Sequence, residues 1–186
     1  MTVKPLKKGA TYDDLARVPE HYVAEMFDGE LYASPRPAIP HARAASVLGV
    51  KLGEPFDVGR NGPGGWLILD EPELHFGNDV LVPDLAGWRR ERLPSVPNDA
   101  YMTLAPDWIC EVISPSTESI DRGKKLRIYA REGVAHAWLV DPLRQWLEVL
   151  VLEAGRLAQI EEHHGESIVR AHPFDAVELD LRALWS

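Results

Sequence analysis

The chain contains a single cysteine, fewer basic than acidic residues, and no long apolar run. One cysteine, Cys110, excludes an internal disulfide and a zinc cluster built from several cysteines. Because its neighbours are apolar, we expect a buried, unreactive thiol. No segment approaches the ~18 consecutive apolar residues that a membrane-spanning helix needs. The N-terminal lysines Lys4, Lys7 and Lys8 are not followed by the apolar segment of a secretory signal. These features predict a cytoplasmic protein.

Positive charge is scarce, with 20 Lys and Arg against 29 Asp and Glu, for a formal net charge of −9. Proteins that bind nucleic acid usually present a basic surface, so the overall charge argues against tight DNA binding. Two basic groups remain: Arg89, Arg90 and Arg92 follow one expected strand, and residues 122–131 carry several more. Each group fits either a solvated face or a nucleic-acid contact. The candidate contacts are Arg89, Arg90 and Arg122.

Length and hydrophobic content are those of an ordinary folded protein. The 186 residues, of which 45% are hydrophobic, predict a single domain over residues 1–186. Periodicity and turn residues predict the following elements: a short helix at 11–15, a β-hairpin of 22–27 and 30–34, a helix over 40–56, strands at 66–69, 73–76, 80–88 and 108–113, a helix from 114–117 to about 132, strands at 135–140, 145–152, 156–162 and 167–171, and one strand or short helix within 174–185.

This order of elements predicts a mixed α/β (α+β) fold, in which helices flank a mixed β-sheet. The strand–helix–strand unit over 108–140 should form a right-handed parallel crossover. Asp28-Gly29 supplies the positive φ angles of a type I′ turn, which predicts an N-terminal β-hairpin.

Two carboxylates have unusually apolar neighbours. Asp84 follows Val80 to Pro83, and Glu111 lies between Cys110 and Val112. A carboxylate near the centre of a sheet is costly unless it is paired or binds a metal ion. Two of them at neighbouring strand positions would suit Mg²⁺ or Mn²⁺, and coordinates placing them more than ~10 Å apart would exclude a shared metal. The alternative is that Asp84 forms a turn and Glu111 points to solvent.

A lysine is expected beside these carboxylates. At ~100° per residue, the apolar positions 126, 129 and 130 define one face of the predicted helix, with Lys125 beside that face and Lys124 pointing away. Lys125 could reach the carboxylates and stabilise developing negative charge, or it could pair with Asp121 one helical turn earlier. Because Lys125 only flanks the apolar face, Lys125→Ala is expected to lower turnover while leaving folding nearly intact.

Several segments together resemble a known family. They are Phe-Asp-Gly-Glu-Leu (27–31) with His41, Val-Pro-Asp-Leu (82–85), Ala-Pro-Asp-Trp-Ile-Cys-Glu-Val-Ile-Ser-Pro-Ser-Thr (105–117), Asp-Arg-Gly-Lys-Lys-Leu (121–126), Tyr-Ala-Arg-Glu-Gly-Val (129–134) and Ala-Trp-Leu-Val-Asp-Pro (137–142). They resemble a bacterial restriction endonuclease family, formerly a domain of unknown function, of the PD-(D/E)XK nuclease superfamily. The resemblance covers nearly the whole chain.

The resemblance implies a restriction-endonuclease-like core and a metal-dependent nuclease that acts on DNA. In it, Asp84 matches the Asp of the Pro-Asp half-motif and Glu111 the acidic residue of the second half. The superfamily places its lysine two residues after that acid, where this chain has Ile113. The family takes its lysine from the following helix, at a position that Lys125 matches.

Two accessory candidates and two other functions stay open. Glu30 follows the hairpin turn and could add an oxygen ligand, or it could be an exposed carboxylate. His41 begins a helix and could touch phosphate, or it could face solvent.

A relative without catalytic activity that binds nucleic acid or protein would lack an acid or the lysine, and all three are present. A metal hydrolase of small phosphate esters would suit the acidic charge. A homodimer that cuts two strands is an analogy only.

Overall fold

The structure, a computed structural model, describes residues 4–186, so the first three residues of the lysine-bearing N-terminal segment lie outside the described residues. The strands are β1 (Lys7–Lys8), β2 (Tyr22–Phe27), β3 (Glu30–Pro35), β4 (Trp66–Asp70), β5 (Leu74–Phe76), β6 (Asp79–Leu81), β7 (Leu85–Arg89), β8 (Trp108–Val112), β9 (His136–Asp141), β10 (Trp146–Glu153), β11 (Arg156–His164), β12 (Ile168–Val169) and β13 (Leu179–Asp180).

The helices are α1 (Tyr12–Leu15), α2 (Ile39–Leu52), α3 (Glu118–Ile120), α4 (Leu126–Arg131) and α5 (Arg182–Trp185). Two π-helical segments extend them: η1 (Gly53–Val58) follows α2, and η2 (Asp121–Lys125) joins α3 to α4. None of the helices in the described part of the chain combines the length and apolar character needed to cross a bilayer.

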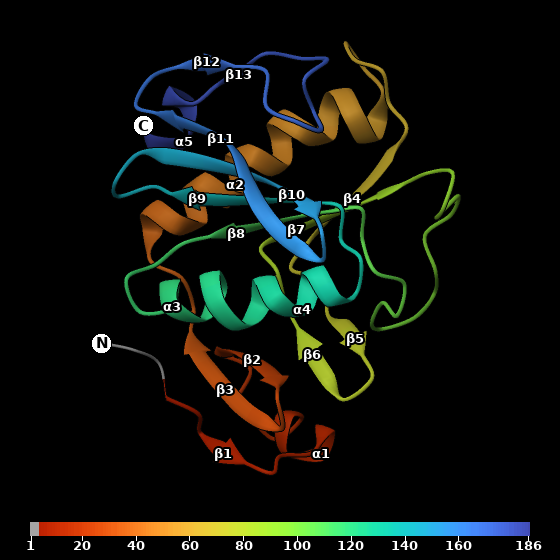
Figure 1. Cartoon of the computed structure of the whole chain (residues 1–186), viewed down its shortest axis with the longest axis vertical. Coiled ribbons are helices and arrows are strands. Elements are labelled where there is room, and N and C mark those ends of the chain that lie inside the picture. Colours follow the sequence, from red (N-terminus) through yellow and green to blue (C-terminus); the bar gives the residue numbers. More distant parts are fainter. Residues whose placement is uncertain (1–3) are drawn as a thin grey trace.

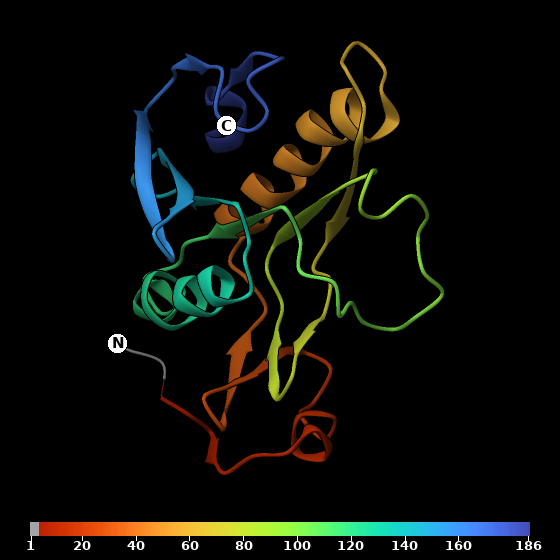
Figure 2. The same ribbon diagram turned by 45° about the vertical axis from the view of Figure 1, so that its right-hand side comes forward.

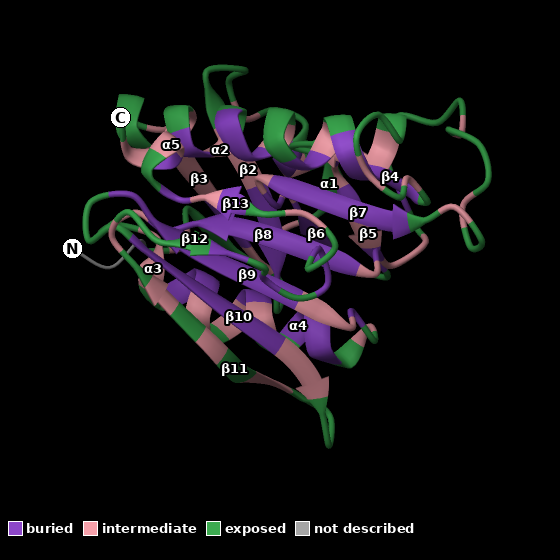
Figure 3. Ribbon diagram, turned by 90° about the horizontal axis from the view of Figure 1, so that it is seen from above, coloured by how far each residue is buried: buried purple, intermediate pink, exposed green. Residues whose placement is uncertain are grey.

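A six-stranded mixed sheet forms the centre of the protein (Figure 1). Its order is β11-β10-β9-β8-β7-β4, and β8 and β9 are its parallel pair, as expected for a crossover through the helix between them. Seen from above, the buried strands lie between α2 on one side and α4 on the other (Figure 3). The two faces bury separate apolar clusters, one with α2 and α5 and one with α4. The predicted mixed sheet flanked by helices is confirmed.

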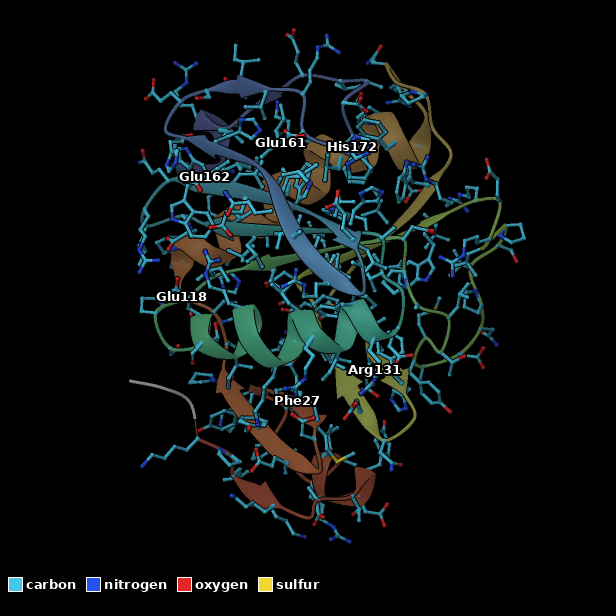
Figure 4. All side chains as sticks on the ribbon, viewed as in Figure 1. Phe27, Glu118, Arg131, Glu161, Glu162 and His172 are labelled. Carbon is cyan, nitrogen blue, oxygen red and sulfur yellow. The ribbon has the colours of Figure 1, made fainter. Side chains whose placement is uncertain are left out.

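A smaller sheet of order β1-β3-β2-β6-β5 lies at the lower end of the molecule, below α4 (Figures 1 and 2). Its β2–β3 hairpin turns at Asp28 and Gly29, whose φ angles are +55° and +70°. The predicted hairpin and its type I′ geometry are therefore confirmed. Ion pairs fasten this sheet to the helix above it: Arg131 of α4, marked in Figure 4, lies 2.8 Å from Asp79 of β6.

The single strand expected over residues 80–88 is wrong. The chain forms β6 in the small sheet, crosses at Val82-Pro83-Asp84, and continues as β7 in the large sheet. Pro83 has no amide hydrogen for a strand ladder, and the amide of Val82 donates instead to the Glu25 side chain, at 2.9 Å. The crossing places Asp84 at the junction of the two sheets.

The expected helix from 114–117 to about 132 is present, but the π-helical segment η2 interrupts it. Near the C-terminus, residues 174–185 hold both a short strand and a short helix, where one element was expected. Cys110 is fully buried, as expected. Burial raises the pKa of its thiol well above the usual value.

Aromatic rings fill the core on the α2 side of the large sheet. Trp66, Trp108 and Trp138 all contact Phe174, with ring centroids 4.8 to 5.6 Å apart. Gly87 of β7 lies where a side chain would meet two of these rings. A Cβ atom there would be 3.2 Å from Trp66 and 3.3 Å from Trp108. The close packing of the tryptophans thus depends on the missing side chain.

We expect Gly87→Ala to lower the free energy of unfolding by ~1–3 kcal/mol, because the added methyl group overpacks a filled core. Urea denaturation with an unchanged m-value would measure it. Gly49→Ala is the control, because a Cβ there meets only Leu85, at 3.8 Å. Gly49 lies inside α2, so its replacement should stabilise by up to ~1 kcal/mol through helix propensity. Equal effects of the two variants would contradict this account of the core.

Candidate active site

A cavity of about 330 Å³ opens at the junction of the two sheets. Its walls come from β2, the segment after β3, the start of α2, the crossing between β6 and β7, the end of β8, and η2. Its charged and titratable lining residues are Glu25, Arg36, His41, Glu71, Asp84, Glu111, Asp121 and Lys125. The cavity therefore gathers all three residues predicted as catalytic.

Asp84 directly precedes β7, and Glu111 lies in the adjacent strand β8 of the large sheet. Leu85 pairs with Cys110 in the antiparallel β7–β8 ladder, so the next cross-strand position brings Asp84 opposite Glu111. Oδ2 of Asp84 also accepts a hydrogen bond from the amide of Val112, at 2.7 Å. The prediction that the strands of these two acids are adjacent in one mixed sheet is confirmed, although Asp84 lies one residue before its strand.

Glu111 is buried and held by two side chains from the helical segment that covers the sheet. Nζ of Lys125 lies 2.9 Å from both of its carboxylate oxygens. The hydroxyl of Tyr129 donates a hydrogen bond to Oε1 at 2.6 Å. Burial raises the pKa of Glu111 well above its usual value, and nearby Lys125 offsets this only in part. The alternative that Glu111 points to solvent is therefore wrong.

Lys125 is 2% exposed and joins carboxylates from three elements. Besides Glu111, its Nζ lies 2.8 Å from Glu25 of β2 and 3.8 Å from Asp121. Burial lowers the pKa of Lys125, but Glu111 and Glu25 raise it more, so its pKa is well above the usual value. Both predicted contacts of this lysine are present, with Glu111 and with Asp121.

Two buried carboxylates of the cavity were not predicted as site residues. Oε1 of Glu25 accepts from the amide of Val82 and pairs with Lys125. It lies between Ala24 and Met26 in a strand, which is the same signal that identified Asp84 and Glu111. Asp121 had been considered only as a helical partner of Lys125. Asp121 and Lys125 are the two buried residues of η2, so Asp121 shares the buried site.

His41, the third residue of α2, lies in the cavity and is largely buried. Its Nε2 atom is 2.9 Å from Oδ1 of Asp84. The two atoms do not have hydrogen-bond geometry, and Nε2 has no hydrogen-bond partner among the described residues. Solvent exposure at the helix start, one of the two interpretations open for His41, is therefore wrong, and its ring faces Asp84.

Glu30 and Lys124 lie outside the cavity and pair with each other. Nζ of Lys124 donates to Oε2 of Glu30 and to the Tyr32 hydroxyl, both at 2.8 Å. This contact is the main reason that the pKa of Glu30 is lowered to about 2. The expectation that Glu30 joins the metal ligands therefore finds no support in the geometry. Lys124 does not simply point to solvent, because it ties the helical segment to the small sheet.

The arginines proposed to contact nucleic acid lie away from the cavity and already have partners. Arg122 forms two hydrogen bonds to Glu148, each 2.8 Å long. Arg90 lies 2.6 Å from Asp57, and the Arg89 guanidinium lies 4.2 Å from the ring centroid of Trp66. Asp84 precedes β7 whereas Arg89 ends it, so they are separated by roughly 17 Å of strand. The sequence could not show this, because all these partners are distant along the chain.

The cavity is acidic. Five carboxyl groups line it, at Glu25, Glu71, Asp84, Glu111 and Asp121, against two strong bases, Arg36 and Lys125. Within residues 4–186 no three His, Cys, Asp or Glu side chains converge closely enough to hold a metal ion by themselves. Asp84 and Glu111 still fit Mg²⁺, which is typically bound through one or two carboxylates, with waters and substrate oxygens completing its shell. The net negative charge of the lining favours a cation.

Residues 10–182 match the Uma2 family, which is described as "Putative restriction endonuclease". The chain belongs to this family. The resemblance predicted from the motifs is thus confirmed, and the match spans every residue of the cavity.

The chain is also similar to two other proteins. The structure is similar to a crystal structure described as "a putative nuclease belonging to DUF820" from Anabaena variabilis, with a TM-score of 0.76 and 22% identity over 95% of this chain and 97% of that chain. At that identity the likeness shows the fold, which is restriction-endonuclease-like. The uncharacterized protein slr1290 of Synechocystis sp. is 31% identical over 124 residues, which span 62% of this chain and 58% of that protein.

Burial raises the pKa of Asp121 to about 6 from a usual value of 3.8, although Lys125 acts in the opposite direction. The folded state therefore binds this proton more tightly than the unfolded state, and stability falls as pH rises from about 4 to about 6. We expect Asp121→Asn to lack this loss. Urea denaturation in EDTA should show the variant gaining up to ~3 kcal/mol relative to wild type across that window. A stability difference that is constant with pH would contradict the raised pKa.

The premise that Lys125 only flanks the apolar face is wrong, because its side chain is buried between carboxylates. Its removal leaves buried carboxylates without a positive partner, so we expect a loss of ~3–5 kcal/mol in unfolding free energy. Lys124→Ala removes the same charge from the adjacent, more exposed residue and should cost about 1 kcal/mol or less. Thermal and urea denaturation at neutral pH measure both. Equal losses of unfolding free energy in the two variants would show that the buried ion pairs of Lys125 do not stabilise the fold more than the exposed contacts of Lys124.

Proposed function

We propose that this protein is a metal-dependent endonuclease that hydrolyses DNA phosphodiester bonds and acts as one domain. The observation that carries the proposal is the cross-strand placement of Asp84 and Glu111 in an open cavity, with Lys125 bound to Glu111. Family membership supports the same activity.

Asp84 and Glu111 are the residues that would hold Mg²⁺ or Mn²⁺. When bound there, such an ion would polarise a phosphodiester and lower the pKa of an attacking water. Asp84 is oriented for this role by the amide of Val112, and Glu111 by Lys125 and Tyr129. Both acids are thus held in place by the fold, which reduces the cost of organising the site.

Lys125 would perform two tasks. Its ammonium group favours the ionised form of Glu111 against the effect of burial, and it places positive charge where negative charge develops during phosphodiester cleavage. Glu25 and Asp121 hold Nζ in position. Ile113, at the position where the superfamily has its lysine, is buried in the apolar cluster on the α4 side. The geometry therefore supports a lysine supplied from the helix.

His41 is suited to an accessory role at Asp84. Its Nε2 atom lies 2.9 Å from Oδ1 of Asp84, so the ring could help to orient that carboxylate. A hydrolase of small phosphate esters remains the second candidate, because the cavity lining is acidic and the chain carries a net charge of −9. A homodimer would place two such sites on the two strands of a duplex.

We expect Glu111→Gln to lower Mg²⁺-dependent plasmid cleavage by ~100-fold or more, because it removes a ligand charge at the reacting centre. The fold should survive, because glutamine has nearly the size of Glu111 and Lys125 keeps its contacts with Glu25 and Asp121. Wild type should also gain thermal stability on addition of Mg²⁺ or Mn²⁺, and the variant should not.

Glu30→Gln is the matched control, since Glu30 is a carboxylate outside the cavity that pairs with Lys124. It should keep its cleavage rate and its response to metal. Equal cleavage by wild type and Glu111→Gln would refute the proposal. If wild type hydrolysed bis(p-nitrophenyl) phosphate with metal but left plasmid and linear DNA intact, hydrolysis of small phosphate esters would replace the proposed endonuclease function.

A further inference from the structure

An ion pair lies at the rim of the cavity. NH1 of Arg36 lies 3.0 Å from Oε2 of Glu71, and both side chains are partly exposed, at 55% and 38%. NH2 of Arg36 also donates to the carbonyl of Glu20, at 3.2 Å. Both members of the pair line the cavity that holds Asp84 and Glu111.

The backbone conformation restricts the positions of Arg36 and Glu71. Arg36 lies between Pro35 and Pro37, and a residue before proline is restricted to extended conformations, so its side chain leaves a stiff segment. Glu71 has a positive φ of +44°, and its amide donates to the carbonyl of Asp84 at 3.1 Å. The position of Glu71 is thereby linked to one of the proposed metal ligands.

Arg36 differs from the other basic residues considered. It is the one arginine in the cavity lining within residues 4–186, whereas Arg89, Arg90 and Arg122 lie elsewhere with other partners. Lys125 is buried among carboxylates, which leaves Arg36 as the strong base at the cavity mouth. An exposed ion pair such as Arg36–Glu71 is weak, so its partner is easily exchanged. A phosphate accepts two hydrogen bonds from a guanidinium and binds it more strongly than most partners do.

We propose that the Arg36 guanidinium binds a backbone phosphate of duplex DNA beside the scissile bond. In the free protein it pairs with Glu71, and on DNA binding the phosphate replaces Glu71 as its partner. This inference rests on the proposed nuclease function and names the residue that binds its substrate. A phosphate entering this acidic cavity meets five carboxyl groups, so a cation at the mouth lowers the repulsion.

The test measures equilibrium binding of a short, fluorescently labelled DNA duplex by fluorescence anisotropy. Ca²⁺ replaces Mg²⁺ in these measurements, and the salt concentration is varied. We expect Arg36→Ala to weaken binding by ~10- to 100-fold through loss of a charged hydrogen-bond pair. The slope of log K against log salt should fall in magnitude by about 0.9, the value for one lost phosphate contact. Under cleavage conditions, Arg36→Ala should raise KM and largely keep kcat.

Glu71→Gln should act in the opposite direction and tighten binding by about two- to fivefold, because it frees the guanidinium and removes a repulsive charge. The double variant Arg36→Ala/Glu71→Gln should bind like Arg36→Ala, since Glu71 acts mainly through Arg36. Arg127→Ala is the matched control, because Arg127 is 64% exposed, pairs with Asp28 at 2.7 Å and lies outside the cavity. It should change affinity less than twofold.

Equal affinities of the Arg36→Ala and Arg127→Ala variants, or weaker binding by Glu71→Gln, would overturn the inference while the nuclease function stands. A metal-loaded wild type that binds no duplex and cuts none would overturn the proposed function together with it. Binding of single-stranded RNA in preference to duplex DNA, with the same response to Arg36→Ala, would overturn the assignment of the substrate.

Discussion

The buried ammonium group of Lys125 is the interaction on which the candidate site depends. Its contacts reach Glu111 in the large sheet, Glu25 in the small sheet and Asp121 in the helical segment. Nζ also lies 3.5 Å from the carbonyl of Val82 in the crossing segment. One cation thus connects the elements that surround the cavity. Burial of a single positive charge is tolerable only because carboxylates surround it.

Local signals in the sequence predicted the local structure well. Asp28-Gly29 specifies its turn through backbone conformation alone. The short helix predicted at 11–15 also forms, and the Thr11 amide at its start donates to the Asp14 carboxylate at 2.9 Å. Asp84 and Glu111 were identifiable because charged residues in apolar strands are costly wherever those strands lie. The same criterion applied to Glu25 would have found the third acid.

Contacts between residues that are far apart along the chain could not be predicted from the sequence. Lys124 and Glu30 are 94 residues apart along the chain, so helical periodicity could not reveal that they pair. Arg122 and Glu148 likewise join a helical segment to a neighbouring strand. The break at Pro83 was missed because a continuous apolar run does not show that its two halves belong to different sheets. Arg90 and Arg122, two of the residues considered for nucleic-acid contact, pair with carboxylates of the protein itself.

Because the chain passes between the two sheets at residues 82–84, the site depends on both of them. Glu25 and the small sheet supply one wall, and β7, β8 and η2 supply the others. Separation of the small sheet by local unfolding would remove Glu25 from Lys125 and loosen the segment that carries Asp84. A partly folded chain therefore lacks the complete constellation. The residues proposed for catalysis therefore come together only when both sheets have docked.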